Sequence, residues 1–213
     1  PKNDYHLFTP NSPKTPRTDF AFGKEFKIHL PTGLCGNLSK SYWRSFCLEQ
    51  DLIRQKIDVF HGLSGEIPKR KEFDKLKYVV TIHDLIFERY PEYYKPIDRK
   101  IYRKKFKYAA EKSDIIIAIS KQTKQDLIDF YSIPEDKIKV VYQSCHDVFK
   151  QQYSSEKINS LKKQNNLPEN YLLNVGTIES RKNLEMIIKV LPKVDLPLVV
   201  LGKKTSYFSD TII

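Results

Sequence analysis

A short apolar run that stops on a histidine and an aspartate constrains the fold of this chain most strongly. The run, residues 78–85, has the sequence YVVTIHDL and is rich in β-branched residues. Apolar runs of this length are typical of strands that are buried on both faces of a parallel sheet. His83 and Asp84 therefore lie where the strand leaves the sheet. In open parallel α/β sheets, ligands bind along that carboxyl edge.

Strand and helix signals alternate along the rest of the chain. Periodicity predicts further strands at residues 5–9, 26–30, 57–60, 114–119, 137–142, 171–175 and 196–201, and helices at residues 39–55, 98–111, 121–131, 156–164 and 181–191. Helices of this length between strands are typical of right-handed crossovers. The sequence therefore predicts an α/β fold with a doubly wound, mainly parallel sheet of the Rossmann-like kind.

The composition becomes polar after Phe149. Residues 150–155, KQQYSS, have the character of a linker, and a new β-α-β unit follows them. We therefore predict one domain at residues 1–149 and the start of a second domain at residues 150–213. The chain begins without Met and ends soon after a strand signal, so we expect a fragment that lacks its first strand.

The charge balance predicts an anionic partner. The chain has 37 Lys and Arg against 26 Asp and Glu, a net charge of +11. Nucleic acid, anionic lipid and a phosphorylated small molecule all suit such an excess. No stretch approaches the roughly 18 apolar residues of a membrane-spanning helix, and no apolar signal segment opens the chain, so we expect a cytoplasmic protein.

Three cysteines, Cys35, Cys47 and Cys145, form no Cys-x-x-Cys pair. An odd number without this spacing argues against a disulfide framework and against a structural zinc site. We therefore expect three free thiols.

Two cations mark a candidate anion site at the start of the helix expected at residues 181–191. Arg181 and Lys182 would lie in its first turn, with Ser180 as its N-cap. Cations are unfavourable at this positive end of the helix dipole unless an anion binds there. Gly176 would let a phosphate approach the backbone closely. Two interpretations stay open: a phosphate site, or side chains that extend into water.

Polar residues also follow two other expected strands. His61 and Gly62 follow the strand at residues 57–60, and Ser120 follows the strand at residues 114–119. With His83, these side chains would converge on one sheet edge, where the histidine can be structural or functional. A Ser/His/Asp triad lacks the Gly-x-Ser-x-Gly motif, and Ser120 is better explained as a helix cap. A metal site of His61, His83 and Asp84 has no recognisable ligand spacing.

Residues 95–107, KPIDRKIYRKKFK, predict a helix with one basic face. At about 100° per residue, an arc of roughly 140° holds Arg99, Lys100, Arg103, Lys104 and Lys107. A basic face beside aromatic residues suits the surface of an anionic bilayer. An ordinary solvated face is the alternative.

Five segments, taken in order, resemble the retaining glycosyltransferases of family 4, which have the GT-B fold. They are VTIHDL at residues 80–85, IAIS at 117–120 followed by Thr123, KIKVVY at 137–142, NVGTIESRKNL at 174–184 and LVVLG at 198–202. The resemblance covers the chain from Ile57 onward. It implies two Rossmann-like domains, an N-terminal one that holds the acceptor and a C-terminal one that holds a nucleotide-sugar donor.

The resemblance also implies roles for single residues. His83 matches the histidine that contacts the donor sugar near the reacting centre, and would be the catalytic residue. Lys182, with Arg181 beside it, matches the basic position that holds the donor diphosphate, and Gly176 and Thr177 match the loop under it. Candidates for the acceptor side of the cleft are His61, Gly62, Asp84 and Ser120.

The chain also departs from the family pattern. Thr177 stands where many members have an arginine, so diphosphate binding would depend on Arg181 and Lys182. The glycine-rich loop after the first N-terminal strand is not found, and the acidic motif of two glutamates would lie beyond Ile213. We therefore expect the 213-residue chain itself to be inactive.

The activity implied is transfer of a hexosyl group, with retention, from a UDP- or GDP-sugar to a glycan or lipid-linked acceptor in cell-envelope polysaccharide or lipopolysaccharide synthesis. No cofactor and no metal are expected, because protein cations would neutralise the leaving diphosphate. The helix at residues 99–107 would contact an anionic membrane at its inner face, and no nucleic acid is expected. The alternative is a non-catalytic GT-B-like module whose basic surface binds nucleic acid or an anionic membrane.

Overall fold

The computed structural model describes residues 3–11, 26–32, 39–71 and 75–209. It divides the chain into two compact units, Pro1–Gln143 and Ser144–Ile213. The division falls shortly before the boundary expected at residue 149, because the 3₁₀ turn η5 (Asp147–Lys150) groups with the second unit. Each unit is described by itself.

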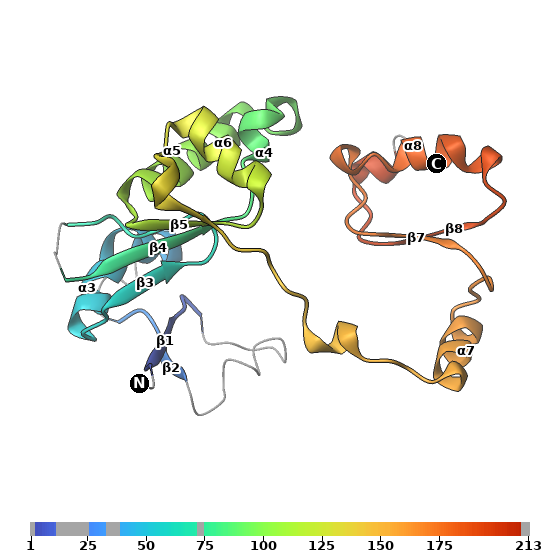
Figure 1. Ribbon diagram of the computed structural model, residues 1–213, viewed down its shortest axis with the longest axis horizontal. Coiled ribbons are helices and arrows are strands. Elements are labelled where there is room, and N and C mark those ends of the chain that lie inside the picture. The colour runs from blue at the N-terminus through green and yellow to red at the C-terminus, as the bar shows by residue number, and fades with distance from the viewer. Residues whose placement is uncertain (1–2, 12–25, 33–38, 72–74, 210–213) are drawn as a thin grey trace. The chain divides into compact units, whose positions relative to one another are not determined.

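A four-stranded parallel sheet forms the centre of the first unit (Figure 1). Its strands lie in the order β3 (Val59–Gly62), β4 (Lys77–Ile82), β5 (Ile115–Ala118) and β6 (Ile138–Val140). A separate parallel pair consists of β1 (Tyr5–Phe8) and β2 (Phe26–His29). Every strand pairing among the described residues is parallel, which confirms the α/β fold class.

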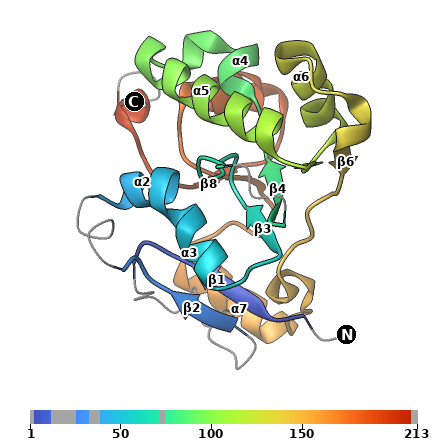
Figure 2. The same cartoon turned by 90° about the vertical axis from the view of Figure 1, so that its left-hand side faces the viewer.

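Helices connect these strands as parallel crossovers. α5 (Pro96–Lys112) links β4 to β5, and α6 (Lys121–Tyr131) links β5 to β6. The sequence missed α4 (Ile86–Arg89), since four residues are too few for a periodic pattern. These three helices lie together in both views (Figures 1 and 2). Two 3₁₀ helices complete the crossovers: η3 (Pro91–Tyr93) and η4 (Glu135–Lys137).

The stretch expected as one helix at residues 39–55 consists of three consecutive segments. They are α2 (Lys40–Tyr42), the π-helix η2 (Trp43–Cys47) and α3 (Leu48–Arg54). Ser39 caps the first of them by accepting a hydrogen bond from the Tyr42 N–H. Trp43, Leu48 and Leu52 of this stretch are buried, whereas Phe46 and Ile53 are 41% and 36% exposed.

β4 runs through the hydrophobic core of the first unit. Tyr78, Val80 and Ile82 are fully buried, as the apolar run predicts. Helix and strand residues around them complete the cluster, including Trp43, Leu52, Ala109, Ala110, Ile116 and Leu127. Burying an aliphatic or aromatic side chain of this size stabilises the fold by about 1.5–3 kcal/mol. β4 is therefore a firmly packed support for the residues that follow its carboxyl end.

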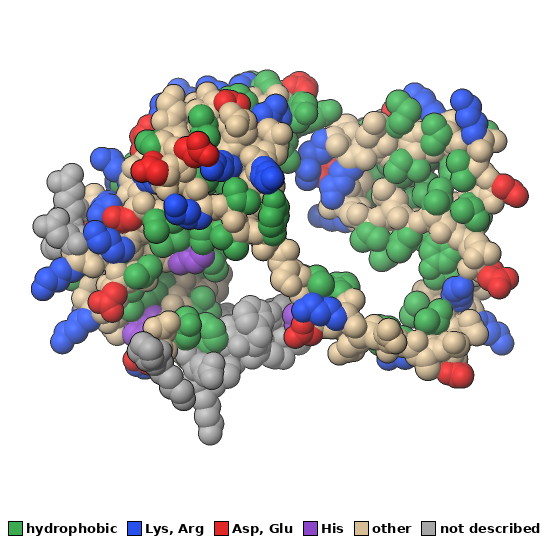
Figure 3. Space-filling model, in the orientation of Figure 1, with side chains coloured by type: hydrophobic (Ala, Val, Ile, Leu, Met, Phe, Trp, Pro, Cys, Tyr) green, Lys and Arg blue, Asp and Glu red, His purple; other side chains and the backbone are tan. Residues whose placement is uncertain are grey.

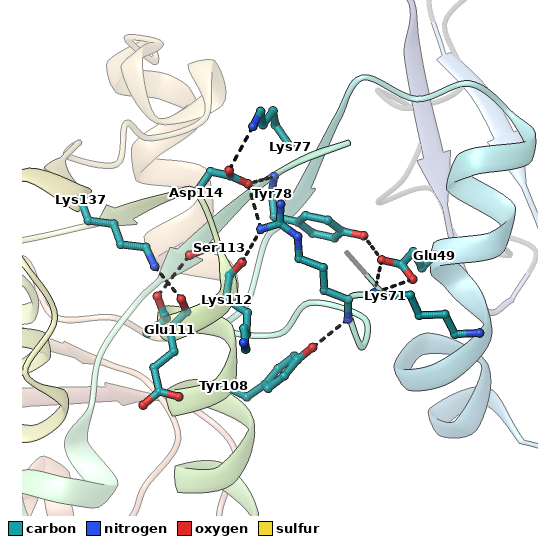
Figure 4. Close-up of polar contacts among 12 residues, drawn as sticks. Glu49, Lys71, Lys77, Tyr78, Tyr108, Glu111, Lys112, Ser113, Asp114 and Lys137 are labelled. Atoms are coloured by element: carbon teal, nitrogen blue, oxygen red, sulfur yellow. Dashed lines mark hydrogen bonds and ion pairs between the residues drawn. The ribbon is translucent and has the colours of Figure 1, made fainter. Parts of the chain in front are cut away.

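A polar network surrounds the amino end of β4 (Figure 4). The buried Glu49 of α3 accepts hydrogen bonds from the Tyr78 hydroxyl, at 2.8 Å, and from the Lys71 N–H, at 2.9 Å. Asp114 accepts one from the Tyr78 N–H, at 2.8 Å, and pairs with Arg70. Burial and the neighbouring Glu49 raise the pKa of the Tyr78 hydroxyl, so this tyrosine stays a donor. The network ties α3 to the sheet at the end opposite His83.

Charged hydrogen bonds hold α4 against its neighbours. Glu88 accepts from Arg103 of α5 and from the Tyr131 hydroxyl of α6, and Arg89 pairs with Asp126 of α6. Burial raises the pKa of Glu88, but the hydrogen bonds from Arg103 and Tyr131 outweigh it and hold the pKa below its usual range. Glu88 is therefore an ionised anchor that fixes α4 between the two longer helices.

The described residues of the second unit form one parallel strand pair and short helices. β7 (Leu172–Val175) pairs with β8 (Leu198–Leu201), and α7 (Ser155–Gln164) precedes them. The helix expected at residues 181–191 is interrupted: it consists of the 3₁₀ turn η6 (Ser180–Lys182), α8 (Leu184–Val190) and the 3₁₀ turn η7 (Leu191–Lys193). Asn183, between η6 and α8, has a left-handed backbone with φ of 53°. Ser180 is therefore not a helix N-cap, and Arg181 and Lys182 precede α8 instead of lying in its first turn.

The cysteines differ from the expected three free thiols. Cys47 is disulfide-bonded, whereas Cys145 is a free, exposed thiol. Cys35 lies outside the described residues. The expectation of a free Cys47 is wrong because an odd count leaves room for one disulfide, and a disulfide needs no Cys-x-x-Cys spacing.

Candidate functional site

His83 follows β4 directly and is held from two sides. Its ring Nε2 lies 2.9 Å from the carbonyl oxygen of Leu63, and its own carbonyl oxygen accepts a hydrogen bond from the Thr123 hydroxyl at 2.9 Å. A carbonyl oxygen can only accept, so Nε2 carries the hydrogen. In the neutral imidazole, Nδ1 is then left as an acceptor. No hydrogen bond to Nδ1 is present among the described residues. His83 can therefore accept a hydrogen bond from a substrate hydroxyl.

His61 and Gly62 lie within the sheet, whereas the sequence predicted that the strand ended at Phe60. The last two residues of β3 are His61 and Gly62, and Gly62 pairs with Val80. The His61 Nε2 lies 2.8 Å from the Thr81 hydroxyl, and burial lowers the pKa of its ring. A side chain at Gly62 would place Cβ 2.1 Å from the Glu66 carbonyl oxygen. The glycine is therefore required by the close approach of the backbone that leaves β3.

Asp84 and Ser120 form local turns beside His83. The exposed Asp84 carboxylate accepts a hydrogen bond from the Ile86 N–H at 3.2 Å, at the start of α4. Ser120 caps α6 by accepting from the Thr123 N–H at 3.0 Å, as the sequence predicts. The structure thus connects His83 with Ser120 through Thr123. It does not bring together a Ser/His/Asp triad, because the Ser120 hydroxyl bonds to Thr123 and not to a histidine.

Two partners of His83 were missed from the sequence. Leu63 contributes only its backbone carbonyl, which no residue type signals. Thr123 follows the strand expected at residues 114–119 by a few residues, yet its hydroxyl bonds to the carbonyl of His83, 40 residues away in the chain. The sequence feature that could have indicated this contact is the spacing Ser120-x-x-Thr123 directly after a buried strand.

In the second unit, the ammonium of Lys182 lies over the backbone of Gly176, which has no side chain. Gly176 follows β7 with φ of 144°, and a Cβ built there would meet the Lys182 Nζ at 2.7 Å. A Cβ at Gly202, after β8, would lie 1.8 Å from the Gly176 carbonyl oxygen. The loops that leave β7 and β8 therefore pack backbone against backbone, and the ammonium of Lys182 covers the first of them.

The two neighbouring cations differ in their partners. Arg181 pairs with the Glu179 carboxylate at 2.7 Å. Within the described ranges, Lys182 has no carboxylate partner, and its N–H donates to the Glu179 carbonyl in the η6 turn. Thr177 lies next to Gly176, and the following Ile178 is buried. Lys182 is therefore the cation that is free to neutralise a bound anion, while the charge of Arg181 is already balanced.

The part of the chain that the structure describes has neither a metal-ion cluster nor a membrane-spanning helix. It contains no group of three or more His, Cys, Asp or Glu side chains placed to hold a metal ion. None of its helices combines the length and the apolar character needed to cross a membrane.

Comparison with known proteins decides the family. A family model described as Glycosyltransferase Family 4 matches residues 2–145, more than half of the chain. The chain belongs to glycosyltransferase family 4. The resemblance drawn from the sequence motifs is thereby confirmed. The matched region of this family 4 chain includes His61, His83 and Ser120, whereas Gly176 and Lys182 lie outside it.

Two relatives from Escherichia coli are similar to the family 4 chain over part of their length. The serotype-specific mannosyltransferase WbdA is 35% identical over 137 residues, which are 62% of this chain and 17% of that protein. The O-antigen chain mannosyltransferase B is 26% identical over 151 residues, which are 68% of this chain and 38% of that protein. The chain thus spans well under half the length of each of these relatives.

Two solved structures have the same fold as this chain. WaaG, described as a glycosyltransferase involved in lipopolysaccharide biosynthesis, matches 97% of this chain and 58% of its own, with a TM-score of 0.60 at 14% identity. Anabaena Alr3699/HepE, in complex with UDP and glucose, matches 88% of this chain and 50% of its own, with a TM-score of 0.56 at 15% identity. At these identities the likeness concerns the fold, and it confirms the GT-B type expected for the family 4 chain.

Proposed function

We propose that this family 4 chain is part of a glycosyltransferase that moves a hexosyl group, with retention, from a nucleotide sugar to a glycan or lipid-linked acceptor. The observation that carries the proposal is the ammonium of Lys182 over Gly176, which has no carboxylate partner among the described residues. A point charge over a backbone without side chains suits the diphosphate of a UDP- or GDP-sugar. The names of the two mannosyltransferase relatives support the same reaction class and favour a mannosyl donor.

Lys182 would act on the leaving group. As the bond between the sugar and the diphosphate breaks through an oxocarbenium-like transition state, negative charge grows on the departing diphosphate. A preorganised cation stabilises that charge more in the transition state than in the ground state, which is what makes it catalytic. The leaving phosphate would take the acceptor proton on the same face of the sugar, which gives retention. Neither a metal nor an organic cofactor is part of the proposal.

His83 would contact the donor sugar. Its Nδ1 is an acceptor in the neutral ring, so it can bind a sugar hydroxyl near the reacting carbon. His61, Gly62 and Asp84 are proposed for the acceptor side. The Ser120 oxygen already accepts from the α6 backbone, so we propose that its role is to build the site.

The process we propose is cell-envelope polysaccharide or lipopolysaccharide synthesis, at the cytoplasmic face of a membrane. The relative named for O-antigen chains and the neighbour described as involved in lipopolysaccharide biosynthesis support this choice.

A transfer assay with the full-length protein tests the proposal. GDP- and UDP-hexoses, mannose donors first, are offered with glycan and lipid-linked acceptors. We expect transfer or donor hydrolysis with retained anomeric configuration, and a turnover about 100-fold lower in His83→Ala, since loss of a group that positions the donor sugar costs on this order. Glu92→Ala, an exposed change in η3, is the matched control. The 213-residue chain alone is expected to be inactive. Neither transfer nor hydrolysis with any donor would contradict the proposal.

We also propose that α5 contacts an anionic membrane. Lys and Arg side chains are spread over the visible face of the first unit, among Asp and Glu (Figure 3). On α5, four cations have partners: Arg99 donates to the Phe87 carbonyl, and ion pairs join Arg103 to Glu88, Lys105 to Glu66 and Lys107 to Glu111. Lys100 and Lys104 have no carboxylate partner among the described residues. They share an exposed face with Ile97 and Ile101, which are 68% and 48% exposed.

This face of α5 combines the two features that bind bilayer surfaces. Exposed isoleucines can enter the headgroup region while the lysines attract anionic lipid, each worth about 1 kcal/mol. We expect Lys100→Ala/Lys104→Ala to bind phosphatidylglycerol-containing vesicles about 30-fold more weakly in co-sedimentation. Lys105→Ala/Lys107→Ala removes the same charge from the same helix at paired positions. An equal loss in both double variants would argue against a specific surface.

A further inference from the structure

A buried threonine fixes the backbone of His83 through a hydrogen bond whose direction is determined. The Thr123 Oγ1 lies 2.9 Å from the His83 carbonyl oxygen and 2.9 Å from the Ser120 Oγ. The carbonyl oxygen can only accept, so the Thr123 hydroxyl must give its one hydrogen to His83. The Ser120 hydroxyl therefore donates to Thr123. The Ser120 hydroxyl thus donates to the Thr123 oxygen, and the Thr123 hydroxyl donates to the His83 carbonyl oxygen.

The same two residues also fix the start of α6. Ser120 Oγ accepts from the Thr123 N–H at 3.0 Å, which makes the serine both the helix cap and the donor to the threonine. Thr123 is 4% exposed and β-branched, so its side chain has little freedom to reorient. The Thr123 hydroxyl that bonds to His83 thus lies on the first turn of α6, an eleven-residue helix.

The ring of His83 depends on a second, independent tie. Its Nε2 donates to the Leu63 carbonyl, and the loop that carries Leu63 is joined to β4 by the Gly65 N–H, which donates to the Thr81 carbonyl at 2.9 Å. The ring can reach the Leu63 carbonyl only while the backbone of His83 keeps its place. A shift of that backbone would break the hydrogen bond from Nε2–H to the Leu63 carbonyl. The ring would then no longer be held in the tautomer that leaves Nδ1 as an acceptor.

We propose that Thr123 is the positioning residue for His83. It holds the His83 peptide through the hydroxyl and thereby keeps the imidazole in the tautomer that can accept from a substrate hydroxyl. The proposal rests on the proposed function of His83 as the residue that contacts the donor sugar. Thr123 itself touches no substrate and acts through the histidine alone.

Three variants separate this role from simple packing. Thr123→Val keeps the shape and removes the hydroxyl, Thr123→Ser keeps the hydroxyl, and Tyr78→Phe removes a buried hydroxyl at the other end of β4. Tyr78 and His83 are five positions apart along β4 and its exit, about 16 Å. In ¹⁵N-edited NMR spectra of the 213-residue chain, we expect one Nε2–H tautomer of His83 in the unsubstituted chain, in Thr123→Ser and in Tyr78→Phe, and a tautomer mixture in Thr123→Val.

Turnover gives a second readout in the full-length protein. We expect Thr123→Val to lower kcat about 10- to 100-fold with KM changed less than about twofold, since a misplacement near 1 Å can cost this much. Thr123→Ser should restore most of the rate, and Tyr78→Phe should keep it. If Thr123→Val does not fold, Thr123→Ala replaces it in both measurements.

The two readouts distinguish the possible failures. An unchanged His83 tautomer in Thr123→Val would overturn the positioning role, whatever the rate. The same holds if folded Thr123→Ser loses the tautomer as Thr123→Val does. A changed tautomer in a protein that transfers no sugar would leave the positioning role standing and would contradict the proposed function instead.

Discussion

Lys182→Ala is expected to lower kcat/KM of the full-length protein for a nucleotide sugar about 100-fold. The ammonium lies over Gly176, has no carboxylate partner among the described residues and is proposed to stabilise the leaving diphosphate. Removing one preorganised group that stabilises transition-state charge typically costs 10²–10³-fold in rate. The measurement is steady-state kinetics, with donor affinity determined separately by calorimetry.

Lys189→Ala is the matched control for this change. Lys189 lies in the same unit, on α8, and pairs with Glu185 at 2.5 Å one helical turn away. The substitution Lys189→Ala removes the same charge from the chain without changing the Gly176 loop. The kcat/KM of this variant should therefore stay within about twofold of the unsubstituted enzyme. Similar losses in Lys182→Ala and Lys189→Ala would mean that general charge, and not the position over Gly176, matters for the donor.

Glu49→Ala is expected to destabilise the first unit by about 3 kcal/mol. The change removes the acceptor for the Tyr78 hydroxyl and for the Lys71 N–H in a buried environment (Figure 4). Each buried donor left without a partner costs about 1–3 kcal/mol. Urea unfolding followed by the fluorescence of Trp43, the single tryptophan, reports on this unit because Trp43 is buried in its core.

Two control substitutions test whether the loss of stability comes from the missing acceptor at Glu49. Glu49→Gln keeps one acceptor oxygen and should cost about 1 kcal/mol, the net worth of a typical hydrogen bond. Gln50→Ala, on the exposed side of α3, should change the unfolding free energy by less than about 0.5 kcal/mol. If Glu49→Ala is no less stable than Gln50→Ala, the network does not hold α3 to the sheet.

Most of the fold could be predicted because its signals are local. The apolar run at residues 78–85 identifies β4, and helical periodicity places α6 at the bounds that the structure has. Three features of the structure were not predicted by local sequence signals. α4 was too short to leave a pattern, the helix expected at residues 181–191 is broken by the left-handed Asn183, and the disulfide of Cys47 carries no spacing motif.

The candidate site could be predicted only in part. The sequence placed His83 and Ser120 at the carboxyl edge of the sheet, since parallel strands end together there. It did not identify Thr123 as the link between them, and it assigned both Arg181 and Lys182 to the donor diphosphate. The ion pair of Arg181 with Glu179 sets the two cations apart, and that pairing depends on side-chain directions that spacing does not encode.

The sequence by itself determined the order of strands and helices, the family and the residues at the edge of the sheet. Burial of apolar side chains at fixed periods is enough to predict the strands and helices, because it depends on neighbours in the chain, and the five sequence motifs carry the resemblance to the family. Only the tertiary structure decided that His83 bonds to Leu63 and Thr123, and that Lys182 covers Gly176. These contacts join segments through strand register and loop path, which no local pattern records.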